Sequence, residues 1–305
     1  MGGITMTLIF LLVVILLVFI LLIGYLMMRF VTHPNRPDFE ETHRLEVAQN
    51  YWGNYDDFPK ETWNIESFDG TILHGTFIPN NSDKYVICTH GYSYNRHGSI
   101  KYANIFYDLG FNIYLYDLRY HGDNEHKESY CTMGDAECQD LAAVIEAVQK
   151  RFGKNIFLGI HGESLGAASS ILVLGKHQDL SFCIADCPFC DLKTLLYYQA
   201  KQMFHMPKFM VHVANACYRI GKGRNFFTVS PLNAIKNNRV PLLLIHGEED
   251  DFIPPFHSRQ LYDSCPDTTI KAIHLMPNAK HAGSYGANPT LYKQWVEAFL
   301  QSLYK

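Results

Sequence analysis

A long stretch without charge opens the chain and limits what it can form. No Asp, Glu, Lys or Arg occurs between residues 2 and 28, and residues 8–22 consist of Leu, Ile, Val and Phe. At about 1.5 Å per residue, one helix of this length can cross the roughly 30 Å hydrocarbon core of a bilayer. The run is long for a secretory signal, lacks a preceding Lys or Arg, and no A-x-A-like cleavage site follows it. Residues 1–30 are therefore expected to form a transmembrane anchor, since a helix apolar on all sides fits poorly in a soluble core.

The charges and cysteines beyond this run predict its orientation. Arg29 and Arg36 follow the apolar stretch, so the positive-inside rule places the rest of the chain in the cytoplasm. All eight cysteines lie beyond the anchor, and several, such as Cys88 and Cys183, fall within apolar runs. Buried thiols suit a reducing compartment. We therefore expect a single-pass protein of the cell membrane whose main domain faces the cytoplasm.

Composition excludes two classes of protein. The chain has 305 residues, of which 48% are apolar and 18% are charged, so it is too hydrophobic to be disordered. Its net charge is −4 and it has no basic run, so we expect no nucleic-acid partner. Residues 31–60 are expected to be a polar juxtamembrane linker, and residues 61–305 a single domain.

From residue 63 onward, short apolar segments alternate with longer amphipathic ones. A hairpin is expected around Asp69-Gly70, followed by strands at residues 85–89, 112–117, 155–160, 182–186, 240–245 and 270–275. Helices are expected at residues 98–109, 135–152, 165–174 and 290–303. This alternation predicts an α/β fold with a mostly parallel sheet, helices on both faces and an antiparallel edge. Ligands then bind beyond the carboxyl ends of the strands.

The sequence Gly162-Glu163-Ser164-Leu165-Gly166 follows one expected strand and opens an expected helix. In this G-x-S-x-G pattern, a tight turn lifts the serine hydroxyl out of the sheet and places it at a helix N-terminus, which favours negative charge. A glycine-rich turn with an incidental serine is the alternative. The preceding strand and the small residues that follow favour Ser164 as a nucleophile.

A serine nucleophile needs a base, and an acid that orients the base; in this type of site they follow in the order Ser, Asp, His. The stretch from His246 to Pro254 has the spacing H-G-x-x-D-x-x-I-P, which selects Asp250. Glu248, Glu249 and Asp251 are its competitors, and a solvated acidic loop is the alternative interpretation.

The candidate base is His281, which lies in a loop after the last expected strand. His274 lies within that strand and His257 within an expected helix, so both are poorer candidates. Two backbone N–H groups should stabilise the oxyanion: that of Leu165, after the nucleophile, and that of Tyr92, in the loop after residues 85–89. His90 is expected to be a structural residue beneath this loop.

These motifs resemble those of the α/β hydrolases, in the serine esterase, lysophospholipase and S33 aminopeptidase-like branch, and above all its bacterial members with one amino-terminal membrane helix. The resemblance implies the α/β hydrolase fold, the Ser164, Asp250 and His281 triad, and the two oxyanion donors. The chain lacks an H-G-G-G motif, which disfavours the hormone-sensitive-lipase-like branch. The matching motifs span nearly all of residues 63–303: His90-Gly91, Asp117-x-Arg119-x-His121-Gly122, Gly162-Glu163-Ser164-Leu165-Gly166, Ala185-Asp186-Cys187-Pro188-Phe189, His246-Gly247-x-x-Asp250 and Lys280-His281.

Residues 191–228 lie where this fold usually inserts a helical cap, and they are rich in Tyr, Phe, Met, His and Leu. Such side chains more often serve packing than substrate contact. An apolar cap over the serine would nevertheless create a dry acyl-binding pocket. With an anchor beside it, the expected substrate is a small-molecule or lipid-derived carboxylic ester, cleaved through an acyl-enzyme as in carboxylesterases and lysophospholipases.

Two other functions use the same sequence features. A peptidase or an acyltransferase could act through the same triad, and a catalytically silent binding protein is disfavoured because the triad is complete.

The cysteines of the chain are expected to be structural. Cys187-Pro188-Phe189-Cys190 has C-x-x-C spacing but does not open a thioredoxin-like unit, so structural thiols are expected. Zinc would need a fourth ligand beyond Cys183, Cys187 and Cys190. We expect no cofactor and no metal.

Overall fold

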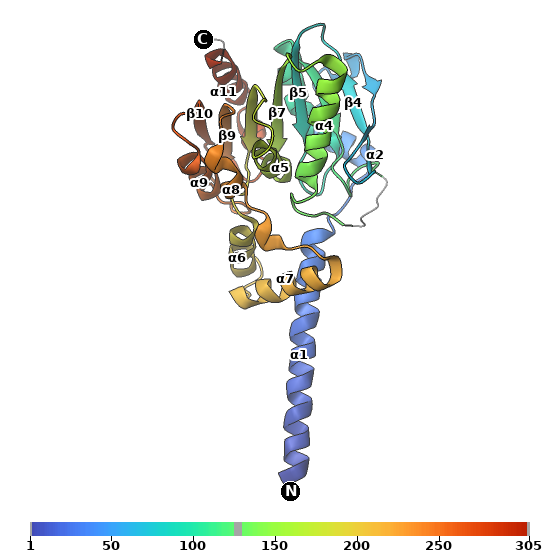
Figure 1. Cartoon of the computed structure of the whole chain (residues 1–305), viewed down its shortest axis with the longest axis vertical. Helices are drawn as coiled ribbons and strands as arrows, with labels where there is room; N and C mark the ends of the chain where they lie inside the picture. Colours follow the sequence, from blue (N-terminus) through green and yellow to red (C-terminus); the bar gives the residue numbers. More distant parts are fainter. Residues whose placement is uncertain (1, 125–129, 304–305) are drawn as a thin grey trace.

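An eight-stranded sheet forms the centre of the computed structural model, which describes residues 2–124 and 130–303 (Figure 1). Its strand order is β1-β4-β6-β5-β7-β8-β9-β10. Strand β4 is antiparallel to both of its neighbours, and every other neighbouring pair is parallel. The strands of this sheet are β1 (Glu61–Thr62), β4 (Gly75–Ile78), β5 (Lys84–Thr89), β6 (Asn112–Tyr116), β7 (Phe157–Glu163), β8 (Phe182–Asp186), β9 (Leu242–Gly247) and β10 (Lys271–Met276).

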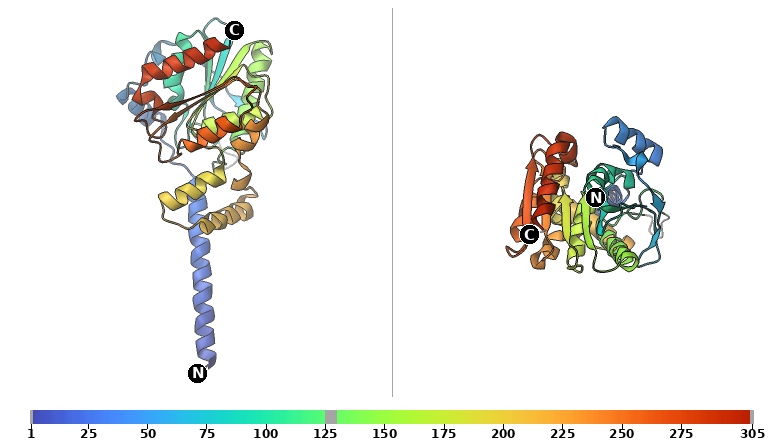
Figure 2. Two further views of the ribbon diagram at one scale, coloured as in Figure 1. Left: turned by 90° about the vertical axis from the view of Figure 1, so that its left-hand side faces the viewer. Right: turned by 90° about the horizontal axis from the view of Figure 1, so that it is seen from above.

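Helices cover both faces of the sheet (Figure 2). Side chains of α4, α5 and α9 belong to one hydrophobic core, whereas those of α3 and α11 belong to a second. Within β5, Ile87 contributes to the first core, and Val86 and Cys88 contribute to the second, as the two-residue period of a strand requires. These helices are α3 (Ile100–Asp108), α4 (Glu137–Phe152), α5 (Leu165–Leu174), α9 (Phe256–Ser264) and α11 (Pro289–Ser302), with short helices α8 (Pro231–Ala234) and α10 (Ser284–Ala287) between them.

Helix α4 shows why these segments fold against the sheet. Its buried residues Leu141, Val144, Ile145 and Val148 follow the spacing i, i+3, i+4, i+7, so they form one apolar stripe along the helix. The mostly parallel sheet with helices on both faces and an antiparallel edge, which the sequence predicts, is confirmed.

The amino-terminal hairpin is smaller than the sequence indicated. Strands β2 (Ile65–Glu66) and β3 (Ile72–Leu73) pair as a separate two-stranded sheet around Gly70, whose φ is +79°. The chain then enters β4 and joins the main sheet. The turn was therefore predicted correctly, and the chain after it divides into β3, which belongs to the small sheet, and β4, which belongs to the large one.

The segment predicted as a juxtamembrane linker packs against the domain. It contains α2 (Phe39–Ala48), which begins after Asp38, whose side chain accepts a hydrogen bond from the backbone N–H of Glu41. Farther along, Tyr55 and Phe58 are buried in the same core as α3 and α11. The sequence did not indicate this packing, because residues 31–60 are mostly polar and contain few such buried side chains.

Helix α1 (Gly2–Thr32) projects from the domain as a stalk, and the cap crosses its last turns (Figures 1 and 2). Among the described helices, it alone is long and apolar enough to cross a membrane. The cap consists of α6 (Leu192–Gln202) and α7 (Lys208–Lys222). Gly24 lets α1 and α7 approach closely, because a Cβ there would lie 2.4 Å from Cγ1 of Val213.

Candidate active site

Ser164 lies in the turn between β7 and α5, at the carboxyl end of a central strand. Its φ of 54° and ψ of −112° lie in a region that residues with side chains rarely occupy. The neighbouring strand helps to hold this conformation, because the backbone N–H of Ser164 donates a 2.8 Å hydrogen bond to the carbonyl oxygen of Asp186. The turn therefore presents the serine side chain just beyond the carboxyl end of β7.

The two glycines of the G-x-S-x-G motif make this turn possible, because the backbone around it packs too closely to leave room for a side chain at either position. A Cβ on Gly166 would lie 2.3 Å from the carbonyl oxygen of Thr89, at the end of β5. A Cβ on Gly162 would lie 2.4 Å from the carbonyl carbon of Gly166. No other residue type fits at either position without moving the backbone.

Three side chains that the sequence selected separately are brought together here. Oγ of Ser164 lies 2.9 Å from Nε2 of His281, and Nδ1 of His281 lies 2.7 Å from Oδ2 of Asp250. These residues follow β7, β10 and β9, whose carboxyl ends lie at the same edge of the parallel sheet. With a proton on Nδ1 donated to Asp250, Nε2 of His281 is free to accept the proton of Ser164.

The carboxylate of Asp250 is buried and held by several donors. Its Oδ1 accepts hydrogen bonds from the backbone N–H groups of Phe252 (3.0 Å) and Ile253 (2.8 Å). Its Oδ2 lies 3.2 Å from Nε2 of His246. Burial opposes ionisation, but hydrogen bonds from His246 and His281 outweigh it and hold the pKa of Asp250 well below its ordinary value. Asp250 is therefore a carboxylate at neutral pH, as an orienting acid must be.

The other acidic residues of this loop point away from the site. Glu248, Glu249 and Asp251 are exposed, whereas Asp250 is buried. The loop therefore sends one carboxylate inward and leaves three in solvent. The spacing of the motif had selected the inward one.

The other histidines in the carboxyl-terminal part of the chain have structural partners. His274 lies in β10, and its ring stacks on Trp295 with the centroids 4.6 Å apart. His257 is buried in α9, where its Nδ1 lies 3.0 Å from Sγ of Cys190. The ring that lies within hydrogen-bond distance of Ser164 is that of His281.

Two side chains to which sequence analysis gave no role support the relay. His246 is buried, and its Nε2 lies 3.2 Å from Oδ2 of Asp250, the same oxygen that His281 contacts. The ring of Phe252 packs against that of His281, with the centroids 4.9 Å apart. The sequence did contain a signal for His246, which is the first residue of the H-G-x-x-D-x-x-I-P motif. No motif indicated a role for Phe252.

The loop after β5 passes directly beside the nucleophile. A Cβ on Gly91 would lie 3.4 Å from Cβ of Ser164, and Tyr92 lines the same small cavity as Ser164 and Leu165. Leu165 is the first residue of α5, where backbone N–H groups have no intrahelical acceptor. Tyr92 and Leu165 thus lie where the sequence places the two oxyanion donors, and their role stays a prediction.

His90 supports this loop from beneath, in agreement with the structural role expected for it. Its Nε2 accepts a 2.9 Å hydrogen bond from the backbone N–H of Leu118, and its Nδ1 lies 2.7 Å from the carbonyl oxygen of Gly91. Burial lowers the pKa of His90 well below its ordinary value. The ring is therefore neutral, and both of its nitrogens are engaged.

A buried ionic cluster lies behind the nucleophile turn. Nζ of Lys101 lies 2.7 Å from Oε2 of Glu163, the residue before Ser164. The hydroxyl of Tyr102 donates a 2.5 Å hydrogen bond to Oε2 of Glu163, and its oxygen also lies 3.2 Å from Oδ2 of Asp186. Burial and the nearby Glu163 raise the pKa of Asp186 to about 6. Sequence analysis did not identify this cluster, because its members are far apart in the chain.

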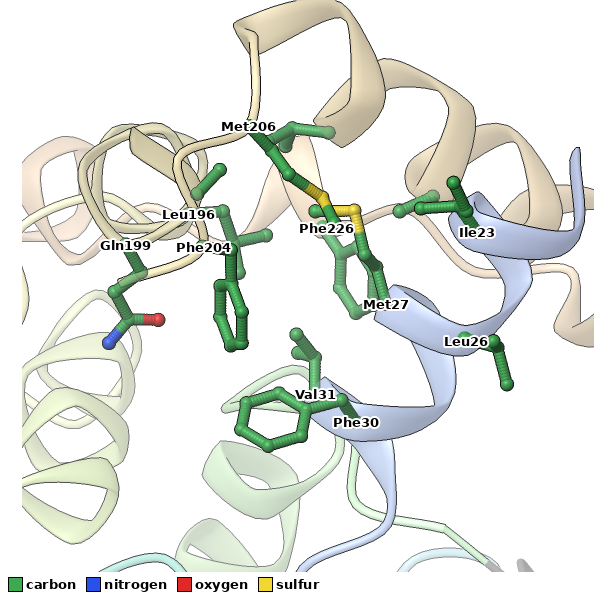
Figure 3. Close-up of a pocket in the computed structure, with 13 residues that line it drawn as sticks. Ile23, Leu26, Met27, Phe30, Val31, Leu196, Gln199, Phe204, Met206 and Phe226 are labelled. Atoms are coloured by element: carbon green, nitrogen blue, oxygen red, sulfur yellow. The ribbon is translucent and has the colours of Figure 1, made fainter. Parts of the chain in front are cut away.

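Apolar side chains surround the nucleophile. Ser164 opens into a small cavity of about 50 Å³, which is adjoined by a larger one of about 350 Å³ (Figure 3). The larger cavity lies between α1 and the cap. Four residues line both cavities: Phe30, Val31, Leu196 and Gln199. The surroundings of Ser164 are therefore largely apolar.

One group of potential metal ligands occurs among the described residues, and it overlaps the relay. Ligand atoms of Cys187, Asp250 and His281 lie within 4.8 Å of one another. Asp250 and His281 already share a hydrogen bond, and burial raises the pKa of the Cys187 thiol well above its ordinary value. Asp250 and His281 are therefore engaged with each other, and the Cys187 thiol lies outside the hydrogen-bonded chain that joins Ser164, His281 and Asp250. All eight cysteines are free, including Cys187 and Cys190 of the C-x-x-C stretch.

Comparisons with known proteins place this site in a wider group. The model of the prolyl oligopeptidase family matches residues 99–305. YqkD of Bacillus subtilis is 31% identical over 254 residues, which cover 82% of each chain. The Pyrococcus furiosus esterase Pf2001 has a TM-score of 0.68 and 25% identity, and the match covers 88% of this chain and 98% of the esterase. Pyrococcus horikoshii acylaminoacyl peptidase has a TM-score of 0.61 and 19% identity, over 79% of this chain but 41% of the peptidase.

Proposed function

Because this chain belongs to the prolyl oligopeptidase family of α/β hydrolases, we propose that it is a serine hydrolase that cleaves carboxylic esters through an acyl-enzyme on Ser164. The observation that carries the proposal is the continuous relay from Oγ of Ser164 through His281 to Asp250, at 2.9 and 2.7 Å. Serine, imidazole and carboxylate in this order activate a hydroxyl that is otherwise a weak nucleophile at neutral pH.

The reaction proceeds in two stages. Nε2 of His281 accepts the proton of Ser164 as Oγ attacks the ester carbonyl, and Asp250 stabilises the imidazolium that forms. The backbone N–H groups of Leu165 and Tyr92 receive the oxyanion, and His281 then protonates the departing alcohol. Water, activated by the same imidazole, releases the acid from the acyl-enzyme.

Two observations favour an ester over a peptide. The cavity at Ser164 is lined mostly by apolar side chains, which suits an acyl chain better than a peptide backbone with its polar groups. The chain also covers nearly the whole of the Pyrococcus furiosus esterase but less than half of the acylaminoacyl peptidase. Peptide hydrolysis is the second candidate, because the family and the second of these neighbours include peptidases by name.

Two measurements test the proposal. A fluorophosphonate probe should label the wild-type protein and fail to label Ser164→Ala, and equal labelling would remove the nucleophile assignment. A series of p-nitrophenyl esters beside aminoacyl p-nitroanilides should give the higher kcat/KM for an ester. A higher value for the anilides would instead establish the peptidase.

We also propose that α1 is a single-pass membrane anchor for a hydrolase domain at residues 61–305 on the cytoplasmic side. The exposed apolar surface of α1, the charges of Arg29 in its last turn and of Arg36 beyond it, and the eight free cysteines support this arrangement. Protease added to sealed right-side-out vesicles should leave the domain intact and should digest it after permeabilisation. Digestion in sealed vesicles would reverse the orientation.

A further inference from the structure

We propose that the last turns of α1 form one wall of the acyl-binding site, and that this site takes the fatty acyl chain of an ester resident in the membrane. The inference rests on the proposed esterase function and adds to it a substrate class and a route of entry. In this arrangement the anchor is part of the enzyme's specificity and not only its attachment.

The cavity between α1 and the cap has the character of an acyl site. Its volume of about 350 Å³ falls within the range of roughly 300–1,000 Å³ of small-molecule sites. Ile23 and Met27 line it from α1, and Phe204 and Met206 line it from the cap (Figure 3). The side-chain amide of Gln199 donates a 3.2 Å hydrogen bond to the carbonyl oxygen of Phe252. This lining polar group is thus already bonded to the protein.

The cavity adjoins the space at Ser164. Phe30 and Val31 of α1 and Leu196 of α6 line both this space and the smaller space at Ser164. The hydroxyl of Tyr92 donates a 2.9 Å hydrogen bond to the carbonyl oxygen of Phe30, so the loop of the expected oxyanion donor is fixed to α1. An acyl chain in the larger cavity would therefore have its carbonyl end beside Ser164.

Helix α1 is longer than the hydrocarbon core of a membrane is thick, so the cavity at its last turns would lie at the membrane surface. The apolar span of Ile4–Thr32 has 29 residues. At about 1.5 Å per residue it is roughly 43 Å long, whereas the hydrocarbon core is about 30 Å thick. About 20 residues are enough to cross, so the last turns, from about Ile23 onward, extend beyond the hydrocarbon. These are the turns that line the cavity, and Leu26 and Phe30 remain 54% and 60% exposed.

Helix α7 presents a second apolar surface at the same level. Val213 contacts α1 at Gly24, and Phe209 and Ile220, which lie on the same side of α7, are 52% and 88% exposed. Lys208 and Lys222 stand at the two ends of the helix. Exposed apolar side chains flanked by lysines are typical of helices that lie in the interface of a membrane. The cap therefore rests where the acyl chain of a lipid ester can pass from the bilayer into the cavity.

The test measures chain-length selectivity in the full-length protein, reconstituted in phosphatidylcholine vesicles. The readout is the ratio of kcat/KM for p-nitrophenyl palmitate to that for p-nitrophenyl acetate. Val31→Trp, at the junction of the two spaces, should lower this ratio by about tenfold or more, because the larger side chain blocks the acyl path. Ala200→Leu should shift the ratio in the same direction from the cap side. Val14→Trp is the matched control on α1, outside the lining of either cavity, and should leave the ratio unchanged.

The outcomes separate this inference from the proposed function. Fluorophosphonate labelling of each variant shows whether its serine is still reactive, and the ratio is compared among the variants that label. Equal ratios for Val31→Trp and Val14→Trp would overturn the acyl site, as would a wild-type protein that cleaves acetate but not palmitate. Acetate cleavage that persists in Ser164→Ala would instead overturn the proposed function on which the inference rests.

Discussion

The hydroxyl of Tyr92 donates a 2.9 Å hydrogen bond to the backbone carbonyl oxygen of Phe30, and this bond joins the loop beside Ser164 to the end of α1. Residues 62 positions apart are thereby held together. The backbone N–H of the same tyrosine is one of the two predicted oxyanion donors. A structural link therefore runs from the apolar stalk to the groups that surround the nucleophile.

Removing this hydroxyl should weaken catalysis modestly. Tyr92→Phe keeps the backbone N–H and the ring but loses the bond to Phe30, which at about 0.5–1.5 kcal/mol corresponds to a roughly two- to tenfold lower kcat. Steady-state ester hydrolysis measures the effect. Tyr107→Phe removes a hydroxyl from a ring that stacks on Phe58 far from the site, and it should keep the wild-type kcat. An unchanged kcat in Tyr92→Phe would show that the link to α1 does not position the loop.

The acid that orients His281 should be Asp250 and not its neighbour. Asp250→Asn should lower kcat by about 10⁴, because an amide no longer fixes the imidazole tautomer that accepts the serine proton. Asp251→Asn changes an exposed carboxylate in the same loop and should alter kcat less than twofold. Equal losses in the two variants would show that the loop as a whole, and not one carboxylate, is required.

Asp186 should make the protein less stable as the pH rises. Burial and the neighbouring Glu163 raise the folded-state pKa of Asp186 to about 6, above its unfolded value of about 4. A raised folded-state pKa contributes stability that is fully present below about pH 4 and is lost as the pH rises through 6. Asp186→Asn lacks this titration. The free energy of unfolding of the wild type, relative to the variant, should therefore fall between pH 4 and pH 7 in urea titrations, and a rise would contradict the assignment.

The pair of Lys101 and Glu163 should be required for folding stability. Lys101→Met leaves a buried carboxylate without its cation beside the nucleophile, a change that typically costs about 3–5 kcal/mol. Lys293→Met breaks a pair with Asp108 whose side chains are 37% and 57% exposed, and it should cost less than about 1 kcal/mol. Chemical denaturation of both variants makes the comparison. Similar small losses would mean that Glu163 finds water or another donor.

Local pattern was sufficient to predict the sheet and to select three side chains that lie within hydrogen-bond distance of one another in the structure. Each strand ends in a recognisable loop, and a parallel sheet necessarily gathers those loops at one edge, so Ser164, Asp250 and His281 could be chosen one at a time. The glycines of the G-x-S-x-G motif also pointed to Ser164, because the tight turn that holds this serine requires close backbone packing at both glycine positions. The predicted strand 182–186 coincides with β8 (Phe182–Asp186).

Local sequence patterns did not predict the contacts between segments that are distant in the chain. The buried pair of Lys101 and Glu163 joins an ordinary helix to the nucleophile turn, and nothing near Lys101 in the chain indicates that its side chain is buried. Residues 31–60 look polar because their anchors, Tyr55 and Phe58, are few and widely spaced. The packing of α7 on α1 was missed for a related reason, since an all-apolar helix has no distinguishable face.

The glycine packing at the nucleophile turn has an evolutionary consequence. Gly166 lies against the carbonyl oxygen of Thr89 with no side chain between them, so main-chain atoms alone fix the height of the turn above the sheet. Amino-acid changes in the surrounding walls can then alter which molecules fit without displacing the reactive oxygen. Such a scaffold can acquire a new preference through one or two exchanges while its chemistry stays the same.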